Sequence, residues 1–281
     1  KSIPSFTDAF FETISGFTTT GASILNNIEE LSHGMLFWRS LTHWVGGLGI
    51  IVISLALLPV FGVSGTQLFA AETTGPTKDK IHPKLNETAK RLFLIYIILT
   101  AAETIFLLFG RMSLFDAVCH SFSTIATGGF STKQASIAYY NSPYIEYVIT
   151  IFMILSGVNF GNYYLAYQRK FDKIKENEEL RFYLIVLFLF TVIVALSLID
   201  FSEVVTGSSV EKAWREAFFT VSSLMTTTGM VTADYMFWKP LTWIILITVM
   251  MTGASAGSTS GGIKMIRVVI SAKACYYEFK R

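Results

Sequence analysis

The amino-acid sequence predicts an all-α polytopic membrane protein with pseudo-fourfold repeats of transmembrane helix, re-entrant loop and transmembrane helix. Three observations lead to this fold class. Of the 281 residues, 52% are hydrophobic and 15% are charged, whereas a soluble domain carries about 25% charged residues. Five apolar segments approach the roughly 20 residues that a helix needs to cross a bilayer. A short unit that ends in threonine and glycine occurs three times.

The five apolar segments are predicted to cross the membrane as helices. They are residues 40–62, 92–110, 144–167, 182–199 and 241–251, and the last continues after a break into 263–274. The break, GASAGSTSGG, is rich in glycine and has no large side chain. Such a break at membrane depth is tolerated only where it faces protein or a water-filled cavity, so it predicts a working part. The alternatives are a packing break between helices and a phosphate-binding loop, which is disfavoured because Ile263 stands where lysine is required.

The basic residues gather on one side of the predicted spans. Lys and Arg favour the cytoplasmic side, and most of the 22 lie after the first and third spans and at the C-terminal end. The opposite connections are richer in acidic residues, which would concentrate cations rather than anions. The net charge of +2 is too balanced for a nucleic-acid surface. Cys119 and Cys275 lack the spacing of a disulfide framework or a zinc site.

The strongest signal is an internal repeat. DAFFETISGFTTTG at 8–21 and EAFFTVSSLMTTTG at 216–229 share 8 of 14 positions without a gap. DAVCHSFSTIATG at 116–128 keeps the acid, Ala, Ser, Thr and Gly, with one residue fewer before the threonine. Each unit is an acid, an apolar stretch too short to span, then threonine and glycine. The repeat therefore predicts a re-entrant half-helix in each unit.

The chemistry of the unit suits a cation. Asp8, Asp116 and Glu216 are predicted in the first turn of each half-helix, where a negative charge complements the helix dipole. The far end then carries unpaired carbonyls to mid-membrane. Threonine adds hydroxyl oxygens, and the glycine adopts the positive φ that aims successive carbonyls the same way. A ring of such oxygens replaces a hydration shell whose loss costs on the order of 20 kcal/mol, although a single unit of this kind is equally typical of a helix cap.

These residues resemble the Trk/Ktr/HKT superfamily of potassium transporters, most closely the bacterial Trk-type potassium-uptake membrane subunit. The matching segments are SGFTTTGAS (15–23), HWVGGLGIIV (43–52), KLNETAKRL (84–92), HSFSTIATGGFST (120–132), TTTGM (226–230) and AGSTSGGIKMIR (256–267). It extends along nearly the whole chain. The resemblance implies four repeats of helix, re-entrant pore loop and helix around one potassium pathway.

The resemblance also implies which residues form that pathway. Each pore loop supplies one strand of a selectivity filter, and the glycine-rich break is an intramembrane gating loop beneath it. The implied ion-binding residues are Thr19, Thr20, Gly21, Ala126, Thr127, Gly128, Thr227, Thr228 and Gly229, with potassium at Thr20, Thr127 and Thr228. The implied gating loop comprises Gly253, Ala254, Ser255, Ala256, Gly257, Ser258, Thr259, Ser260, Gly261 and Gly262.

The same comparison divides the chain into repeats. Residues 1–83 are expected to be a first repeat without its leading helix, 84–175 a second repeat, and 176–281 a third repeat that includes 253–262. A fourth repeat is absent, and so is the basic residue that opposes the gating loop in the family. We therefore expect the sequence to be a fragment.

The predicted function is potassium uptake across the plasma membrane, the inner membrane of bacteria, by a multi-pass protein that is not an enzyme. Potassium is the transported substrate, and no cofactor is predicted. The resemblance implies a cytosolic nucleotide-binding regulatory subunit and a homodimer of the complete protein. The lipid bilayer is an expected partner and nucleic acid is not. The basic connections at 78–91 and 169–181 are predicted to bind the regulator or anionic lipid.

Two other function classes remain open. A proton- or sodium-coupled cation symporter with broken helices would use Glu103, because a carboxylate within a span is functional by default. A protonated Glu103 bonded to a neighbouring helix is favoured over that role. An intramembrane hydrolase would need a serine paired with a histidine, and the glycine-rich break has no histidine in reach. Asn159 is predicted to form a structural interhelical hydrogen bond in preference to binding an ion, and the cluster Gly46, Gly47 and Gly49 is predicted to permit close helix approach.

Overall fold

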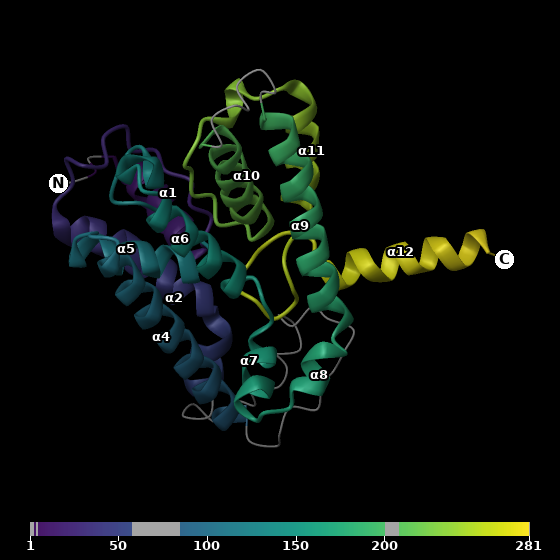
Figure 1. Ribbon diagram of the computed structural model, residues 1–281. Helices are drawn as coiled ribbons and strands as arrows, with labels where there is room; N and C mark the ends of the chain where they lie inside the picture. The colour runs from purple at the N-terminus through teal and green to yellow at the C-terminus, as the bar shows by residue number, and fades with distance from the viewer. Residues whose placement is uncertain (1–2, 4, 58–84, 200–207, 281) are drawn as a thin grey trace.

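Short half-helices and long apolar helices alternate along the chain. The computed structural model describes residues 3, 5–57, 85–199 and 208–280, and this part contains helices and an isolated parallel bridge between Thr252 and Ile263, but no strand. The predicted all-α fold class is confirmed. The helices in Figure 1 are α1 (Phe6–Phe17), α2 (His33–Leu57), α4 (Leu85–Phe109), α5 (Leu114–Ile125), η2 (Ser136–Tyr140), α6 (Pro143–Ser156), α7 (Phe160–Tyr167), α8 (Phe171–Lys175), α9 (Glu178–Leu198), α10 (Ser208–Met225), η4 (Tyr235–Phe237), α11 (Pro240–Met251) and α12 (Met265–Phe279).

The predicted membrane crossings differ from one another in continuity. Helices α4, over Lys90–Phe109, and α9 are each long and apolar enough to cross a membrane. The third predicted span is instead bent by 90° between α6 and α7. α11 is a shorter apolar helix that ends where the glycine-rich break begins. α2 is kinked at Gly49 (φ 53°), and residues 58–62 of the first predicted span lie outside the described residues.

Two half-helices begin at side-chain caps that the sequence supplies. Ser5 accepts a hydrogen bond from the N–H of Asp8 (3.4 Å) and Ser113 from the N–H of Asp116 (3.1 Å). Both acids lie in the first turn, as predicted. The serine satisfies a backbone donor that the helix leaves free, and the acid complements the positive end of the dipole.

The third half-helix is longer than its pattern predicts. α10 begins at Ser208, so Glu211 is the acid of its first turn and the placement predicted for Glu216 is wrong. The eight residues before Glu216 contain neither Gly nor Pro. They also form the i,i+4 ion pairs Glu211 with Arg215 (3.1 Å) and Lys212 with Glu216 (3.8 Å). These features extend the helix on its N-terminal side.

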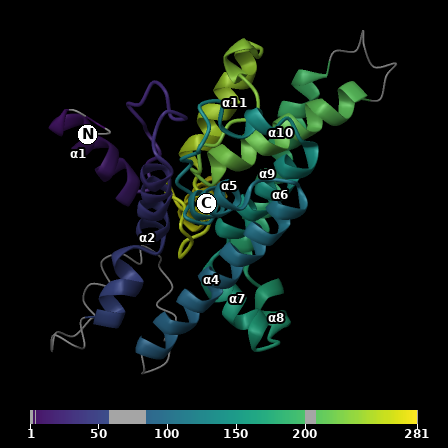
Figure 2. The ribbon, with the colours of Figure 1, turned by 90° about the vertical axis from the view of Figure 1, so that its left-hand side faces the viewer.

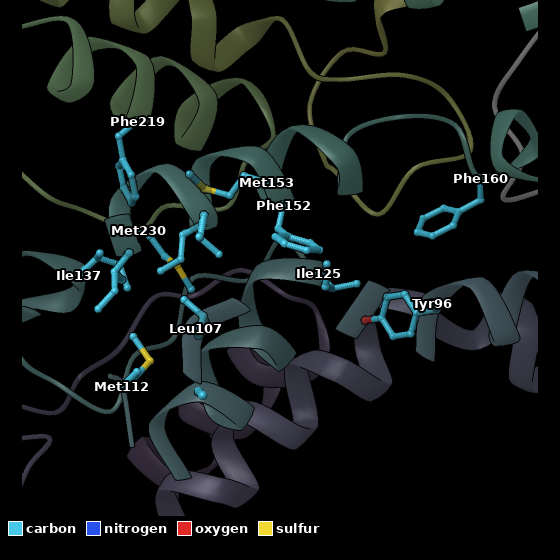
Figure 3. Close-up of a cluster of buried hydrophobic side chains, with 14 residues drawn as sticks. Tyr96, Leu107, Met112, Ile125, Ile137, Phe152, Met153, Phe160, Phe219 and Met230 are labelled. Atoms are coloured by element: carbon cyan, nitrogen blue, oxygen red, sulfur yellow. The ribbon is translucent and has the colours of Figure 1, made fainter. Parts of the chain in front are cut away.

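Two of the half-helices each pack between two neighbouring helices. α5 packs against α2 and α4, and α10 packs against α6 and α9. α1 contacts α2, beside which it lies in Figure 2. One hydrophobic cluster, drawn in Figure 3, includes Tyr96, Met153 and Met230. A second cluster includes Tyr183 and Met225 and joins α9 and α10 to α11 and α12.

Glycines let α2 approach the inner ends of two half-helices. A Cβ on Gly46 would overlap the carbonyl oxygen of Phe17, the last residue of α1. A Cβ on Gly47 would lie 2.6 Å from Ala126, the C-cap of α5. The predicted packing role is thus confirmed at these two positions. A Cβ on Gly49 would meet no described atom within 4 Å, and the positive φ of Gly49 forms the kink of α2 instead.

Large apolar side chains cover the outside of the long helices. Leu94 and Ile98 on α4, Ile185 and Phe188 on α9, and Ile244 on α11 are 55% to 65% exposed. A broad exposed apolar surface is unusual for a protein in water. It is the expected surface of a helix in contact with lipid chains.

Part of the predicted inner side lies outside the described residues. This applies to Lys78, Lys80 and Lys84 and to the boundary between the first two repeats at 83. Within the described part, Lys273 of α12 pairs with Glu178 at the start of α9 (2.5 Å). The guanidinium of Arg91 lies over the ring of Tyr164, 5.2 Å from its centroid.

The glycines of α2 provide a test of this packing. We expect Gly47→Ala to lower the melting temperature of the full-length protein in detergent, because overpacking at a close backbone approach costs about 1–3 kcal/mol. Gly34→Ala is the control, since a Cβ there meets no atom within 4 Å. The control should melt at or above the wild-type temperature because alanine favours the helix. Equal stability of both variants would contradict the close approach.

Candidate functional site

The three half-helices end in the same backbone turn. The residue after the C-cap adopts a left-handed conformation each time, at Thr19 (φ 52°), Thr127 (φ 52°) and Thr227 (φ 56°). We call residues 18–21, 126–129 and 226–229 the first, second and third threonine-glycine turns. The recurrence shows that the sequence repeat is a repeat of backbone geometry.

Two hydrogen bonds close each turn in the pattern of a Schellman motif. The N–H of Thr19 donates to the carbonyl of Gly16 (3.1 Å), and that of Thr20 donates to Ser15 (3.0 Å). The corresponding bonds are Thr127 to Thr124 (2.9 Å), Gly128 to Ser123 (2.8 Å), Thr227 to Leu224 (3.1 Å) and Thr228 to Ser223 (2.8 Å). The motif satisfies carbonyls at the helix end that no water in a bilayer core would satisfy.

Threonine occupies the position where such a motif ordinarily has glycine. A left-handed conformation costs an L-residue roughly 1–2 kcal/mol, and a β-branched side chain is among the least suited to it. Glycine would cap a helix at no such cost. Three strained threonines in equivalent places therefore favour a functional role of the backbone over simple helix capping.

The one-residue difference predicted for the second unit is wrong. Because Thr127 has the conformation of Thr19, Ala126 corresponds to Thr18, and the helix from the acid to the C-cap has equal length in both units. The corresponding glycines are Gly21 (φ 74°), Gly129 (φ 84°) and Gly229 (φ 80°). The sequence comparison matches Gly128, the first glycine of the Gly-Gly pair. An ungapped alignment that starts from the acid identifies the second glycine, Gly129, as the corresponding residue.

Neighbouring turns lie backbone against backbone. A Cβ on Gly21 would overlap the carbonyl oxygen of Gly128, and a Cβ on Gly129 would overlap that of Thr228. The first turn therefore contacts the second, and the second contacts the third. A Cβ on Gly229 meets no described atom within 4 Å. The arrangement brings carbonyl groups of successive turns together, as an oxygen-lined path requires.

A pair of hydroxyls lies in each of two turns, and in the other turn an imidazole lies beside the backbone. The hydroxyls of Thr18 and Thr20 are 2.8 Å apart, and the third turn repeats this pair at 2.7 Å. In the second turn a Cβ on Gly128 would overlap the ring of His43. That ring stacks on Phe130 with centroids 4.0 Å apart. Among the described residues no group of three or more His, Cys, Asp or Glu suits a metal ion.

Side chains on the half-helices brace the segments that follow the turns. Glu12 of α1 accepts a hydrogen bond from the hydroxyl of Ser23 (2.9 Å) and another from the N–H of Ile24 (3.2 Å). His120 of α5, at the position that corresponds to Glu12, bonds through Nε2 to the hydroxyl of Ser131 (2.9 Å). Both contacts tie the outgoing chain back to the half-helix that precedes it.

A buried arginine joins the first two braces. Arg39 of α2 is 3% exposed and donates from Nε to Glu12 (2.8 Å). It also donates to the carbonyl of Ser131 (3.4 Å), and its guanidinium lies over the ring of Phe130, 4.1 Å from the centroid. The sequence analysis did not identify Arg39, because its partners come from two segments that are distant in the sequence and meet α2 only in the folded structure.

The glycine-rich loop 253–262 reaches two of the turns. The N–H of Gly261 donates to the side-chain oxygen of Thr227 (2.7 Å). The hydroxyl of Thr259 donates to the carbonyl of Ile125, the last residue of α5 (3.0 Å). The loop runs through the centre of the molecule in Figure 1, between α11 and α12. Its tip therefore lies at the inner ends of the second and third turns.

Two polar residues singled out in the sequence lie away from the turns. Glu103 of α4 is completely buried and interacts with Thr124 of α5, but neither carboxyl oxygen forms a hydrogen bond of regular geometry within the described residues. Asn159 caps α7 by accepting from the N–H of Gly161 (2.7 Å). Its amide also lies beside Gly257 of the loop, where a Cβ would be 3.2 Å away. Asn159 thus has a structural role at the bend between α6 and α7.

Comparisons with known proteins agree with this geometry. A family model described as TrkH, cation transport protein, matches residues 1–281. The Trk system potassium uptake protein TrkH of Escherichia coli (strain K12) is 44% identical over 277 residues, which are 98% of this chain and 57% of the relative. The protein of the same name from Halomonas elongata is 38% identical over 269 residues, with 95% and 55% covered.

A solved structure gives the same result. The crystal structure of the potassium transporter TrkH from Vibrio parahaemolyticus superposes with a TM-score of 0.83 at 34% identity and covers 99% of this chain and 56% of that one. The chain spans a little more than half the length of these relatives. The repeat architecture predicted from the sequence is consistent with that fold.

The Arg39 brace provides a test by stability. We expect Arg39→Met to destabilise the full-length protein by about 3–5 kcal/mol, because the buried carboxylate of Glu12 loses its partner. Lys212→Met is the control, since it removes the exposed pair with Glu216, a kind of pair worth about 0–1 kcal/mol. The double variant Glu12→Leu, Arg39→Met should recover much of the loss in urea-unfolding midpoint. A single variant no worse than the control would contradict the brace.

Proposed function

The chain belongs to the TrkH family of cation transport proteins, and from this premise we propose that it carries potassium ions inward through a pathway formed by its threonine-glycine turns. It is a multi-pass protein of the plasma membrane, the inner membrane of bacteria. The relatives named above are potassium transporters and potassium uptake proteins. The transport activity of this chain, its ion and its partners are part of the proposal.

One observation supports the proposal most strongly. Three strained turns of identical backbone geometry come from distant parts of the chain and contact one another in sequence order. Their half-helices point the negative end of the helix dipole toward the turns. That combination lowers the energy of a dehydrated cation and disfavours an anion.

The proposed selectivity filter follows the corrected register. Its residues are those of the predicted set, Thr19, Thr20, Gly21, Ala126, Thr127, Gly128, Thr227, Thr228 and Gly229, to which Thr18, Thr226 and Gly129 are added by correspondence. In this register Thr127 corresponds to Thr19, and Gly128 corresponds to Thr20 and Thr228. Potassium is therefore proposed to bind the oxygens of Thr20, Thr127 and Thr228, as in the predicted set, and that of Gly128. The open side of Gly229 is where a further turn of a longer chain would complete the ring.

The glycine-rich loop is proposed to gate this pathway. Its tip hydrogen bonds to Thr227 and to the carbonyl of Ile125, so in this position it occupies the inner end of the path. Ser258 further stabilises the loop by donating to the carbonyl of Ser255 (2.6 Å). Small side chains permit such a segment to lie at membrane depth.

The remaining assignments follow from family membership. We propose that the chain comprises three repeats with boundaries at 83 and 175, and that the full-length protein works as a homodimer with a cytosolic nucleotide-binding regulatory subunit. Neither a cofactor nor an enzymatic reaction is part of the proposal. A proton- or sodium-coupled symporter is the alternative function. Glu103 lies beside α5, and this position gives no reason to prefer the symporter over potassium uptake.

The filter is tested by rubidium uptake in a potassium-starved host that expresses the full-length protein. We expect Gly129→Ser and Gly229→Ser each to reduce the preference for rubidium over sodium about tenfold, because a side chain at positive φ displaces the carbonyl oxygens from the ion. Gly34→Ser is the control, since its Cβ meets no atom within 4 Å. An unchanged ion preference in both variants, at normal expression, would sink the filter assignment.

The gate is tested by shortening the loop. Deletion of Ser258, Thr259 and Ser260 removes the contact with Ile125 and the hydroxyl pair between Ser258 and Ser260. We expect rubidium flux in liposomes to rise several-fold, because the path loses its block. Ion preference should stay at the wild-type value, since the turns are untouched. Wild-type flux in the shortened protein would reduce the loop to a packing break.

A further inference from the structure

One buried carboxylate holds the glycine-rich loop against a transmembrane helix. Glu179 lies in the first turn of α9 and is 8% exposed. Its Oε1 atom accepts a hydrogen bond from the N–H of Ala256 (2.7 Å), inside the loop, and another from the N–H of Ile266 (3.2 Å), just after it. A single oxygen on α9 therefore bonds the chain on both sides of residues 257–265.

The bond to Ile266 supplies a cap that α12 lacks in its own sequence. Lys264, the N-cap residue of α12, makes no side-chain capping bond. The first N–H groups of a helix have no partner within it, and a negative charge near them is favourable. Glu179 provides both from a different helix. Hydrogen bonds to an ionised acceptor are roughly twice as strong as neutral ones.

The loop keeps its own shape without Glu179. The N–H of Gly253 donates to the carbonyl of Ile263 (2.8 Å), and the N–H of Ile263 donates to that of Met251 (3.2 Å). These bonds join the two ends of the loop at its base. Loss of the carboxylate would consequently free the loop from α9 as a unit, while its closed base remains.

A second pair of hydrogen bonds holds the loop against the bend between α6 and α7. The N–H of Ser255 donates to the carbonyl of Gly157, and the N–H of Phe160 donates to that of Gly257 (3.1 Å each). Both partners belong to the bend between α6 and α7. These hydrogen bonds join neutral groups, so the hydrogen bonds to the carboxylate of Glu179 are the stronger of the two sets of contacts.

We propose that Glu179 is the positioning residue that keeps the loop in the closed position, with its tip on Thr227 and Ile125. The inference rests on the proposed function for its transport consequence, although the contact itself is independent of that function. Release of Glu179 shifts the loop away from the turns and opens the path. Lys264 interacts electrostatically with Glu179 and moves with the loop.

The test combines a labelling measurement with a transport measurement on the full-length protein. Ser260→Cys, in a background where the exposed Cys275 is replaced by serine, places a thiol at a loop position that is 4% exposed. With Glu179→Ala added, we expect a polar thiol reagent to label this cysteine about tenfold faster, and rubidium flux into liposomes to rise by a similar factor. Selectivity for rubidium over sodium should not change.

Glu178→Ala is the matched control. Glu178 is the neighbouring residue, and it pairs with Lys273 on the same helix α12 (2.5 Å) but with no loop residue. We expect labelling and flux at wild-type levels. An equal rise in this control, or wild-type labelling in the Glu179→Ala protein, would overturn the proposal, because either result separates the loop position from this carboxylate.

Two further arms keep the outcomes distinct. Glu179→Gln retains an acceptor oxygen without the charge, so we expect a smaller rise in labelling than with alanine. If the alanine variant does not fold, Glu179→Gln replaces it in the test. Labelling at the wild-type rate in the glutamine variant would then contradict the proposal. Absence of rubidium uptake by the wild-type protein would contradict the proposed function, whereas the labelling comparison tests Glu179 without any transport.

Discussion

A helix that ends inside a membrane must satisfy its last carbonyl groups without water, and the rest of this structure depends on that constraint. Each of the three half-helices meets it with a Schellman-type turn whose two N–H donors point back at the helix. The donors that close the turn are then used up, and among the described residues no backbone N–H donates to the carbonyls of the turns themselves. Close glycine contacts of α2 and between turns bring these groups together. A cation is the partner that such an arrangement best accommodates.

The backbone geometry of the turns repeats in all three units, whereas the side-chain contacts around them repeat only in part. Corresponding positions on the half-helices are occupied by Glu12 and His120, which bond the hydroxyls of Ser23 and Ser131. In the third unit the hydroxyl of Ser223 donates to the carbonyl of Met230 (2.8 Å), as that of Ser15 does to Ala22 in the first (2.6 Å). The carbonyl of Val231 also accepts the N–H groups of Ile137 and Ala138 (3.1 Å each). Shared and unshared contacts together hold three turns in one strained conformation. Strain of this kind persists only where the surroundings over-determine it.

Local pattern predicted much of this structure, and long-range contacts account for what it missed. The sequence repeat identified the half-helices and the turns. Helix capping, the short apolar segment and the threonine-glycine pattern each depend only on residues close together in the sequence. The correspondence of Gly129 was missed because the comparison placed a one-residue gap before the threonine, whereas the ungapped spacing from Asp116 and the positive φ of Gly129 both identify it. The bend beside Gly157 was missed as well, because the residues packed against Gly157, which are Tyr183, Thr226 and Ala254, are distant from it in the sequence. Composition alone cannot separate a straight apolar span from one that must bend around a loop.

The hydroxyl of Thr227 connects the proposed gate with the proposed filter. With the loop in place, this oxygen accepts the N–H of Gly261, which directs a partial positive charge at the inner end of the path and occupies a lone pair. The same oxygen regains that lone pair when the loop withdraws. In the proposed mechanism, an ion at this oxygen and the loop bonded to it draw on the same hydroxyl. By thermodynamic linkage, whatever this shared contact costs the ion when the loop is in place, it costs the loop equally when the ion is bound.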